Sequence, residues 1–228
     1  MRRIEHLLIV AGPTGCGKKT LIREILASRI PEVQTRIGVE NLQECPWMGA
    51  HLIARLTELE LKRLILHYDF LWSSDGSKVE MPGGQSASSI LEGARQVSLV
   101  TVWTPPARLE RQLIEGKLQT PLQANNVQVL KAGIFRRLPY FAIRGLSRFP
   151  FLKQINHWLP RRPFIHHLLL LRLYTRPNEV VAMYRRWFQF CDRQIPKTRD
   201  HVIVEFDREL KFYSRDEWEN RIQIYQGG

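Results

Sequence analysis

A glycine-rich segment between an apolar run and an amphipathic run constrains this chain more than any other feature. Residues 4–10 (IEHLLIV) predict a buried strand, and residues 18–29 predict a helix that begins where the glycines end. Glycines allow successive backbone N–H groups to converge on one anion, and a helix N-terminus adds the positive end of its dipole. The segment therefore predicts a strand–loop–helix unit that binds phosphate, with Lys18 supplying a full positive charge.

The rest of the chain continues the alternation of strands and helices. Apolar runs at 64–72, 97–103 and 201–206 predict strands, and 228 residues are enough for one substantial core. This alternation predicts an α/β fold in one domain, residues 1–228, with a parallel sheet covered by helices on both faces. Helices are predicted over 50–63, 88–96, 105–115 and 178–194, and again after Ser214, which has the capping-box spacing to Glu217.

Residues 12–20, GPTGCGKKT, resemble the Walker A motif of the P-loop nucleoside triphosphatase superfamily, most closely the loops of small P-loop kinases. The resemblance is specific over residues 7–22 and extends loosely over the chain through the strand alternation. It implies a P-loop fold, ATP or another purine nucleotide as cofactor, and phosphoryl transfer. The nucleotide-binding residues that it implies are Gly12, Pro13, Thr14, Gly15, Cys16, Gly17, Lys18, Lys19 and Thr20.

Lys19 departs from the family pattern, which has Ser or Thr at this position to ligate magnesium. An ammonium group repels a cation, and Thr20 does not replace the hydroxyl because one helical step turns a side chain by about 100°. Three interpretations follow. Magnesium is held by water and a carboxylate elsewhere, or Lys19 itself neutralises phosphate charge, or the loop binds nucleotide without hydrolysing it. The need for magnesium is therefore open, and no metal ligand is assigned.

Asp69 is the leading candidate for a catalytic carboxylate. It ends an apolar strand, at the edge of the sheet where ligands bind in open parallel sheets. By resemblance to P-loop kinases, such an acid orients magnesium or accepts the proton of a substrate hydroxyl. His67 lies two residues earlier and so faces the same side, although the pattern favours a core histidine over a site role for it. Asp75 and Glu80, in the following loop, are weaker candidates for substrate contacts.

The segment TVWTPPARLERQL is similar to the strand and helix that precede the arginine-bearing lid of small P-loop kinases. The resemblance implies that Arg111, and with less weight Arg108, contacts the transferred phosphate, since a guanidinium matches two phosphate oxygens. The alternative is a solvated helix face on which these arginines pair with Glu110 and Glu115.

Residues 116–178 contain eleven Lys or Arg and no Asp or Glu, so this stretch accounts for almost all of the formal net charge of +12. Apolar and aromatic residues alternate with the charges at roughly helical spacing, and Pro139, Pro150 and Pro163 divide this pattern into short pieces. The pattern predicts a basic amphipathic helical insertion or lid within the P-loop domain.

Four interpretations of this insertion remain open. Its apolar face can pack on the core, or its basic helices can contact an anionic membrane surface or a lipid-linked substrate through residues 131–163. It can also cover an anionic small-molecule substrate as a lid. Nucleic acid is the least favoured partner, because no nucleic-acid-binding motif accompanies the charge.

Cysteine usage and hydropathy bear on the compartment. Cys16, Cys45 and Cys191 are odd in number and lack metal-binding spacing, which favours a reducing compartment. No apolar run approaches the roughly 18 to 20 residues of a membrane-spanning helix. The expected location is the cytoplasm, with peripheral contact to the inner face of a membrane as a further expectation.

The expected function is an ATP-dependent kinase that transfers phosphoryl to a small or lipid-linked acceptor, with Lys18, Asp69 and Arg111 as catalytic residues. One alternative is a P-loop sulfotransferase that uses phosphoadenosine phosphosulfate without metal; Lys19 favours it and the intact Gly17-Lys18 pair disfavours it. Another is a non-catalytic, nucleotide-responsive protein on the membrane surface.

Overall fold

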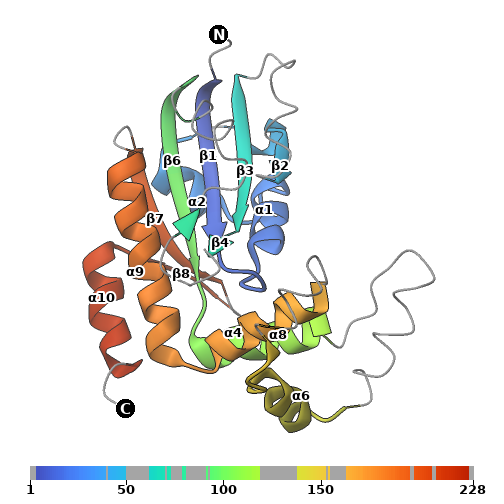
Figure 1. Ribbon diagram of the computed structural model, residues 1–228. Coiled ribbons are helices and arrows are strands. Elements are labelled where there is room, and N and C mark those ends of the chain that lie inside the picture. Colours follow the sequence, from blue (N-terminus) through green and yellow to red (C-terminus); the bar gives the residue numbers. More distant parts are fainter. Residues whose placement is uncertain are drawn as a thin grey trace, which may run out of the picture. The chain divides into compact units, whose positions relative to one another are not determined.

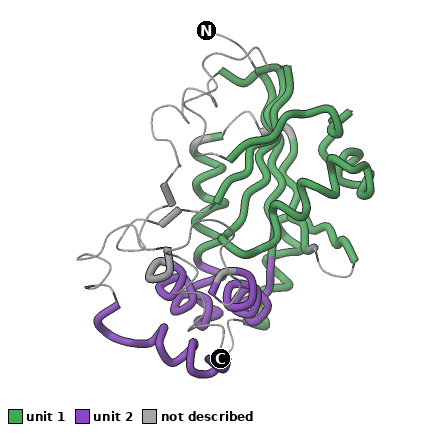
Figure 2. The backbone as a smooth tube through the Cα atoms, turned by 90° about the vertical axis from the view of Figure 1, so that its right-hand side faces the viewer, with its two compact units in different colours: residues 1–103, 183–224 green, residues 104–182, 225–228 purple. Residues whose placement is uncertain are grey.

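The structure of the protein is a computed structural model that describes most of the chain in two compact units. Unit 1 comprises residues 1–103 and 183–224, and unit 2 comprises 104–182 and 225–228 (Figure 2). The described residues are 4–39, 41–49, 62–69, 71–72, 79–80, 91, 93–118, 138–152, 154, 163–195, 198–206 and 209–225.

Unit 1 is built on a six-stranded sheet with the order β2-β3-β1-β6-β7-β8. All neighbouring strands are parallel except β8, which is antiparallel to β7 (Figure 1). A separate antiparallel pair joins β4 and β5. The strands are β1 (Ile4–Gly12), β2 (Trp47–Gly49), β3 (Arg63–Asp69), β4 (Leu71–Trp72), β5 (Val79–Glu80), β6 (Ala94–Trp103), β7 (Thr198–Phe206) and β8 (Leu210–Tyr213).

The helices alternate with these strands, which confirms the expected α/β class. The α-helices are α1 (Lys18–Leu26), α2 (Pro31–Ile37), α4 (Pro106–Leu113), α6 (Tyr140–Ser147), α8 (Pro163–Tyr174), α9 (Pro177–Gln194) and α10 (Arg215–Ile222). Shorter helical turns are η1 (Leu42–Glu44), η3 (Ile114–Leu118, a π-helix) and η4 (Gln223–Tyr225). None of the helices in the described segments is long and apolar enough to cross a lipid bilayer.

Some predicted boundaries were wrong. The helix expected over 88–96 gives way to β6 at Ala94, because residues 94–96 pair with the start of β1. Most of the helix expected over 50–63 falls outside the described residues, and Arg63 begins β3. The capping box of α10 is confirmed: Ser214 Oγ accepts from the Glu217 N–H at 3.2 Å, and the Ser214 N–H donates to Glu217 Oε2 at 2.7 Å.

β1 is the central strand because its apolar residues are buried on both faces. Residues 7–11 are each no more than 1% exposed. After β1 the chain forms β2 and then β3 on one side of it, while β6 lies on the other side and leads to β7 farther out. Right-handed crossovers in opposite directions place helices on opposite faces. Accordingly α1 and α2 cover one face of the sheet, and α9 and α10 cover the other (Figure 1).

An aromatic cluster packs α9 and α10 against the sheet. The Trp103 ring lies 4.8 Å from the Tyr184 ring and 5.4 Å from the Trp218 ring, both edge-on, and Phe188 also packs edge-on against Trp218. Trp103, Tyr184 and Trp218 are all fully buried. Edge-to-face contacts of this kind stabilise a core beyond the area that they bury.

A buried polar chain runs from α9 through β6 to β7. Trp187 Nε1–H donates to Thr101 Oγ1 at 2.9 Å, and the Thr101 hydroxyl lies 2.8 Å from His201 Nε2. Because Thr101 Oγ1 already accepts from the indole, its own proton is available for His201 Nε2, which favours the tautomer with the proton on Nδ1. Burial, and next the Arg215 guanidinium, lower the pKa of His201 to about 4.

His201 should make the stability of the fold depend on pH. Its folded pKa is lowered from 6.5 to about 4, so the unfolded chain binds the proton first as the pH falls. The free energy of unfolding should therefore decrease between about pH 6.5 and pH 4, by on the order of 3 kcal/mol. Urea unfolding across this range should show a shallower pH dependence for His201→Gln than for the parent. Parallel curves for the two proteins would contradict the assignment.

Candidate functional site

The glycine loop lies at the carboxyl end of the central strand. β1 ends at Gly12 and α1 begins at Lys18, and the register places Gly12 opposite Asp69 at the end of β3. The chain turns to one side after β1 and to the other side after β6. In open parallel sheets the carboxyl ends of two such strands form the crevice where ligands bind.

The backbone of the loop has the conformation that an anion-binding turn requires. Gly15 and Gly17 both have φ of 92°, in the left-handed region that favours glycine. Alternation of left-handed and right-handed residues turns successive N–H groups toward a common point. The N-cap of α1 is Gly17, without a side-chain hydrogen bond, and the first turn holds no acidic residue. The start of α1 therefore keeps its positive dipole end for an external anion.

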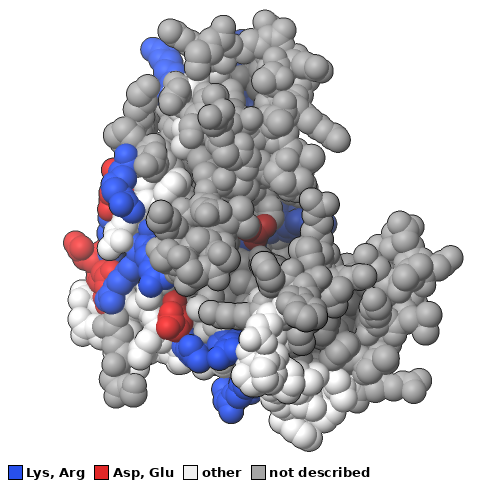
Figure 3. Space-filling view, viewed as in Figure 1, with Lys and Arg blue, Asp and Glu red and all other residues white. Residues whose placement is uncertain are grey.

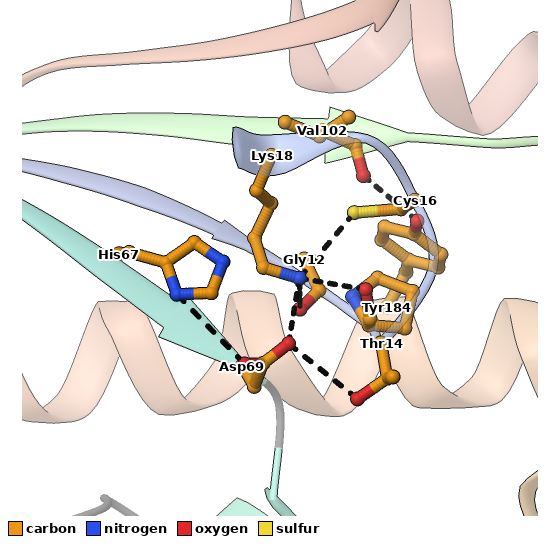
Figure 4. Close-up of polar contacts among 9 residues, drawn as sticks. Gly12, Thr14, Cys16, Lys18, His67, Asp69, Val102 and Tyr184 are labelled. Atoms are coloured by element: carbon orange, nitrogen blue, oxygen red, sulfur yellow. Dashed lines mark hydrogen bonds and ion pairs between the residues drawn. The ribbon is translucent and has the colours of Figure 1, made fainter. Parts of the chain in front are cut away.

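Lys18 folds back into the loop instead of extending into solvent. Its side chain is 3% exposed, and Nζ donates to the carbonyl oxygens of Gly12 at 2.9 Å and Pro13 at 2.7 Å (Figure 4). Asp69 Oδ1 lies 2.7 Å from the same Nζ. An ammonium group has three N–H donors, so these three oxygens satisfy it. A phosphate must displace at least one of these oxygens to bind Lys18.

Asp69 connects Lys18 to two further side chains. Thr14 Oγ1 donates to Asp69 Oδ1 at 3.5 Å, and His67 Nδ1 lies 3.9 Å from Asp69 Oδ2 (Figure 4). The Asp69 side chain is 37% exposed, while that of His67 is only 11% exposed. The carboxylate is thus half-buried at the loop, where it can meet both a cation and an incoming ligand.

Cys16 packs across the loop against Gly12. Its Sγ lies 3.6 Å from Lys18 Nζ, and burial raises the pKa of the thiol in spite of that ammonium. The thiol is therefore a small apolar wall of the loop and not a nucleophile. Beside it, the Val102 carbonyl oxygen accepts from the Tyr184 hydroxyl at 2.8 Å, which fixes the end of β6 next to Gly12.

The close approach of Cys16 explains why position 12 must be glycine. A Cβ at Gly12 would lie 2.4 Å from Cys16 Sγ and 3.2 Å from the Val102 carbonyl oxygen. Gly12→Ala should lower the free energy of unfolding by about 2 kcal/mol through overpacking, and adding Cys16→Ala should recover most of that loss. The matched control is Gly145→Ala, where a Cβ meets nothing within 4 Å and should be neutral or stabilising. Equal urea midpoints for the parent and Gly12→Ala would contradict this packing.

The remaining residues expected to bind nucleotide lie around these groups. Lys19 and Thr20 are both exposed at the start of α1, so neither is committed to the core. The described residues contain no cluster of three or more His, Cys, Asp or Glu side chains that could hold a metal ion.

The structure brings only part of the predicted set together. Lys18 and Asp69 meet with Thr14 and Cys16 in unit 1, whereas Arg111 and Arg108 lie on α4 in unit 2, Arg111 exposed and Arg108 half-buried. Asp75 lies outside the described residues. Glu80 lies in the short strand β5.

Sequence reasoning missed several contacts. The loop motif marks Thr14 and Cys16 as nucleotide-binding positions but does not show that Thr14 contacts Asp69 or that Cys16 covers Gly12. Tyr184 carries no motif, and it reaches Val102 across 82 positions of sequence. Only its place on the apolar face of a predicted helix indicated that it would be buried.

A cavity of about 340 Å³ lies in unit 1 among residues other than those of the glycine loop. It is lined by Leu99, Cys191, Asp192, Ile195, His201, Ile203 and Arg215. Arg215 and Asp192 form an ion pair there at 2.7 Å. Leu99 pairs with Ile9 in β1, three positions before the glycine loop begins, so this cavity is distinct from the loop.

Comparisons with known proteins add little to this geometry. No protein-family profile and no curated protein sequence matches the chain. Among solved structures, the chain is similar to shikimate kinase from Bacteroides thetaiotaomicron, with 13% sequence identity, 96% of each chain covered and a TM-score of 0.31. A similarity of this extent does not indicate a function for this chain.

Proposed function

We propose that this chain binds a purine nucleotide through its phosphates and transfers a phosphoryl group to a small or lipid-linked acceptor. The observation that carries the proposal is the contact of 2.7 Å between Lys18 Nζ and Asp69 Oδ1 at the glycine loop. It brings together a cation that can stabilise phosphate charge and a carboxylate that can accept a proton. Asp69 ends β3, and Lys18 begins α1 after the loop that follows the neighbouring strand β1.

In this proposal each group has a defined task. Residues 12–20 bind the phosphates through backbone N–H groups, with Lys18 moving from Asp69 to a phosphate oxygen. Asp69, once released from Lys18, accepts the proton of the acceptor hydroxyl as the phosphoryl group transfers. Arg111 is proposed to stabilise charge on the transferred group. Positioning and electrostatic stabilisation would supply most of the rate acceleration.

Magnesium fits these residues only in part. The Asp69 carboxylate and the Thr14 hydroxyl are oxygen groups that meet at the loop, and Lys19 removes the usual hydroxyl ligand. Magnesium commonly uses one or two carboxylates and completes its shell with water and phosphate oxygens. Asp69 would therefore be its protein ligand, and the ion would neutralise phosphate charge.

A sulfotransferase is the second candidate, because Lys19 places an exposed ammonium where a metal ligand would be expected. Such an enzyme would bind phosphoadenosine phosphosulfate without metal. The third candidate, a nucleotide-responsive protein, would use the same loop without turnover.

Calorimetric titration and a turnover assay distinguish the three candidates. ATP, GTP and phosphoadenosine phosphosulfate are each tested with magnesium and with a chelator, and nucleoside diphosphate release is measured in the presence of pooled hydroxyl acceptors. Binding of ATP or GTP with turnover supports the kinase. Metal-free consumption of the sulfate donor alone replaces it with the sulfotransferase, and tight binding with no turnover replaces it with the nucleotide-responsive protein. Absence of binding to all three compounds rejects the phosphate site itself.

The proposed location is the cytoplasm. Cys16, Cys45 and Cys191 are free thiols in the structure, as expected in a reducing compartment. A lipid-linked acceptor would require contact with a membrane through residues 131–163, of which 138–152, 154 and 163 are described.

A further inference from the structure

Five large apolar side chains are exposed within twelve residues of unit 2. Phe141 is 75% exposed, Phe151 is 52% and Phe149 is 50% exposed, and Tyr140 and Leu146 are each 40% exposed. We call these five residues the 140–151 patch. They lie on α6 and on the turn that follows it. Single exposed apolar residues are ordinary on protein surfaces, whereas a group of this kind marks an interaction site.

The segment that carries the patch also has a packed inner side. Ile143 and Ser147 of α6 are completely buried, and Leu152 is 6% exposed. α6 packs on α8 within unit 2. Arg144 Nε lies 3.1 Å from Glu110 Oε1 on α4, which joins α6 to a second helix of the same unit. Phe141 therefore lies outside the packed side of α6, whereas Tyr140, although 40% exposed, also interacts with Glu110 on α4.

Two aromatic side chains of the patch contact each other, and basic residues lie close to them in sequence. The Phe149 and Phe151 rings lie 5.6 Å apart and edge-on. Arg144 lies three residues after Phe141 on α6, and Arg148 follows four residues later. Arg148 is exposed. In Figure 3 the described residues at the lower right, where Figure 1 shows α6, are mostly neither Lys or Arg nor Asp or Glu.

The charge of the surrounding sequence indicates what covers the patch. Residues 116–178 hold eleven Lys or Arg and no Asp or Glu. A second copy of the chain would bring two such positive segments together, which is unfavourable. Aromatic and aliphatic side chains beside arginine suit the boundary between lipid headgroups and acyl chains, and anionic lipids attract the basic residues.

We propose that the 140–151 patch docks the protein on an anionic lipid bilayer. Phe141, Phe149 and Phe151 enter the headgroup boundary, and Arg148 pairs with lipid phosphate or carboxylate. Contact of this kind is peripheral and reversible, because a few rings bury far less apolar surface than a spanning helix. The inference does not depend on the phosphoryl-transfer proposal.

Vesicle flotation of the full-length chain tests the proposal. The probes are vesicles of phosphatidylcholine alone and of phosphatidylcholine with about one third phosphatidylserine. Phe141→Ser/Phe149→Ser/Phe151→Ser should reduce binding to the anionic vesicles at least about tenfold, because each ring loses its burial. Arg148→Gln should reduce that binding about fivefold and should not change binding to neutral vesicles.

Ile224→Ser is the matched control, because Ile224 is 74% exposed in unit 1 and lies outside the patch. It should bind anionic vesicles as the parent does. Circular dichroism and the melting temperature should be unchanged in all variants, since exposed side chains are replaced. Nucleotide binding by the triple variant should equal that of the parent, which separates this test from that of the proposed function.

Three outcomes of flotation and light scattering would overturn the proposal. They are equal flotation of the parent and the triple variant, no flotation of the parent with either vesicle, and a parent dimer in light scattering that the triple variant abolishes while neither binds vesicles. A shift of single-stranded RNA by the parent, lost in the triple variant and without vesicle binding, would likewise replace lipid with nucleic acid.

Discussion

Lys18→Met should weaken nucleotide binding about 10-fold to 100-fold and lower any turnover by a further factor of about 10³. Hydrogen bonds from a charged donor contribute about 1.5 to 3 kcal/mol, which corresponds to the expected loss of affinity. The larger effect on turnover follows because charge on the transferring group grows in the transition state. Titration calorimetry with ATP and GTP, followed by measurement of nucleoside diphosphate release, gives both quantities.

The matched control for this substitution is Lys62→Met. Lys62 is exposed just before β3, whose other end faces the loop. The substitution Lys62→Met removes the same charge from the protein. It should leave nucleotide affinity within about twofold, since long-range effects of one exposed charge are screened. If Lys62→Met weakens binding as much as Lys18→Met does, the effect is one of net charge, and the role of Lys18 in the loop is rejected.

Asp69→Asn should have opposite effects on binding and on turnover. In the absence of magnesium the asparagine no longer competes with phosphate for Lys18 Nζ, which lies 2.7 Å from Asp69 Oδ1. Nucleotide affinity should then increase, by up to about fivefold for a half-exposed ion pair. Turnover should fall by about 10² to 10⁴, because the amide cannot accept a proton from the acceptor hydroxyl.

Glu24→Gln provides the control for the loss of a carboxylate. Glu24 lies on α1 and pairs with Arg29 at 3.4 Å, away from the loop side chains. It should change neither binding nor turnover. A fall in metal-free nucleotide affinity in Asp69→Asn would contradict competition for Lys18. A turnover equal to that of the parent would remove Asp69 from catalysis.

The fold was predictable where local pattern and global topology agree. The apolar run of β1 followed by glycines is compatible with only a few structures, so the strand, the loop and α1 could be placed from sequence. The start of helix α10 could also be predicted, because Ser214 and Glu217 have the spacing of a capping box. The parallel sheet followed from the alternation of these elements.

Other parts of the fold depend on partners distant in sequence. Residues 94–96 were expected to be helical, but pairing with β1 makes them the start of β6. Strand β8, with only four residues, was missed because its pairing with β7 is a tertiary contact. Local propensity does not contain such pairings.

The candidate site was predictable as a set of residues but not as a geometry. The motif marked Lys18 and the end of a strand marked Asp69. Their contact depends on the register that places Gly12 opposite Asp69, which the sequence alone does not give. The position of Lys18 inside the loop was also not predictable, since carbonyl oxygens of Gly12 and Pro13 hold it there.

Phosphate recognition by the loop is tested most directly by the calorimetric affinity of the parent chain for a nucleoside diphosphate relative to its nucleoside. We expect ADP or GDP to bind at least about 100-fold more tightly than adenosine or guanosine, because the loop and Lys18 recognise phosphate. This difference should largely disappear in Lys18→Met. Equal affinities for the diphosphate and the nucleoside, or no measurable binding of either diphosphate, would contradict a phosphate-binding role for the loop.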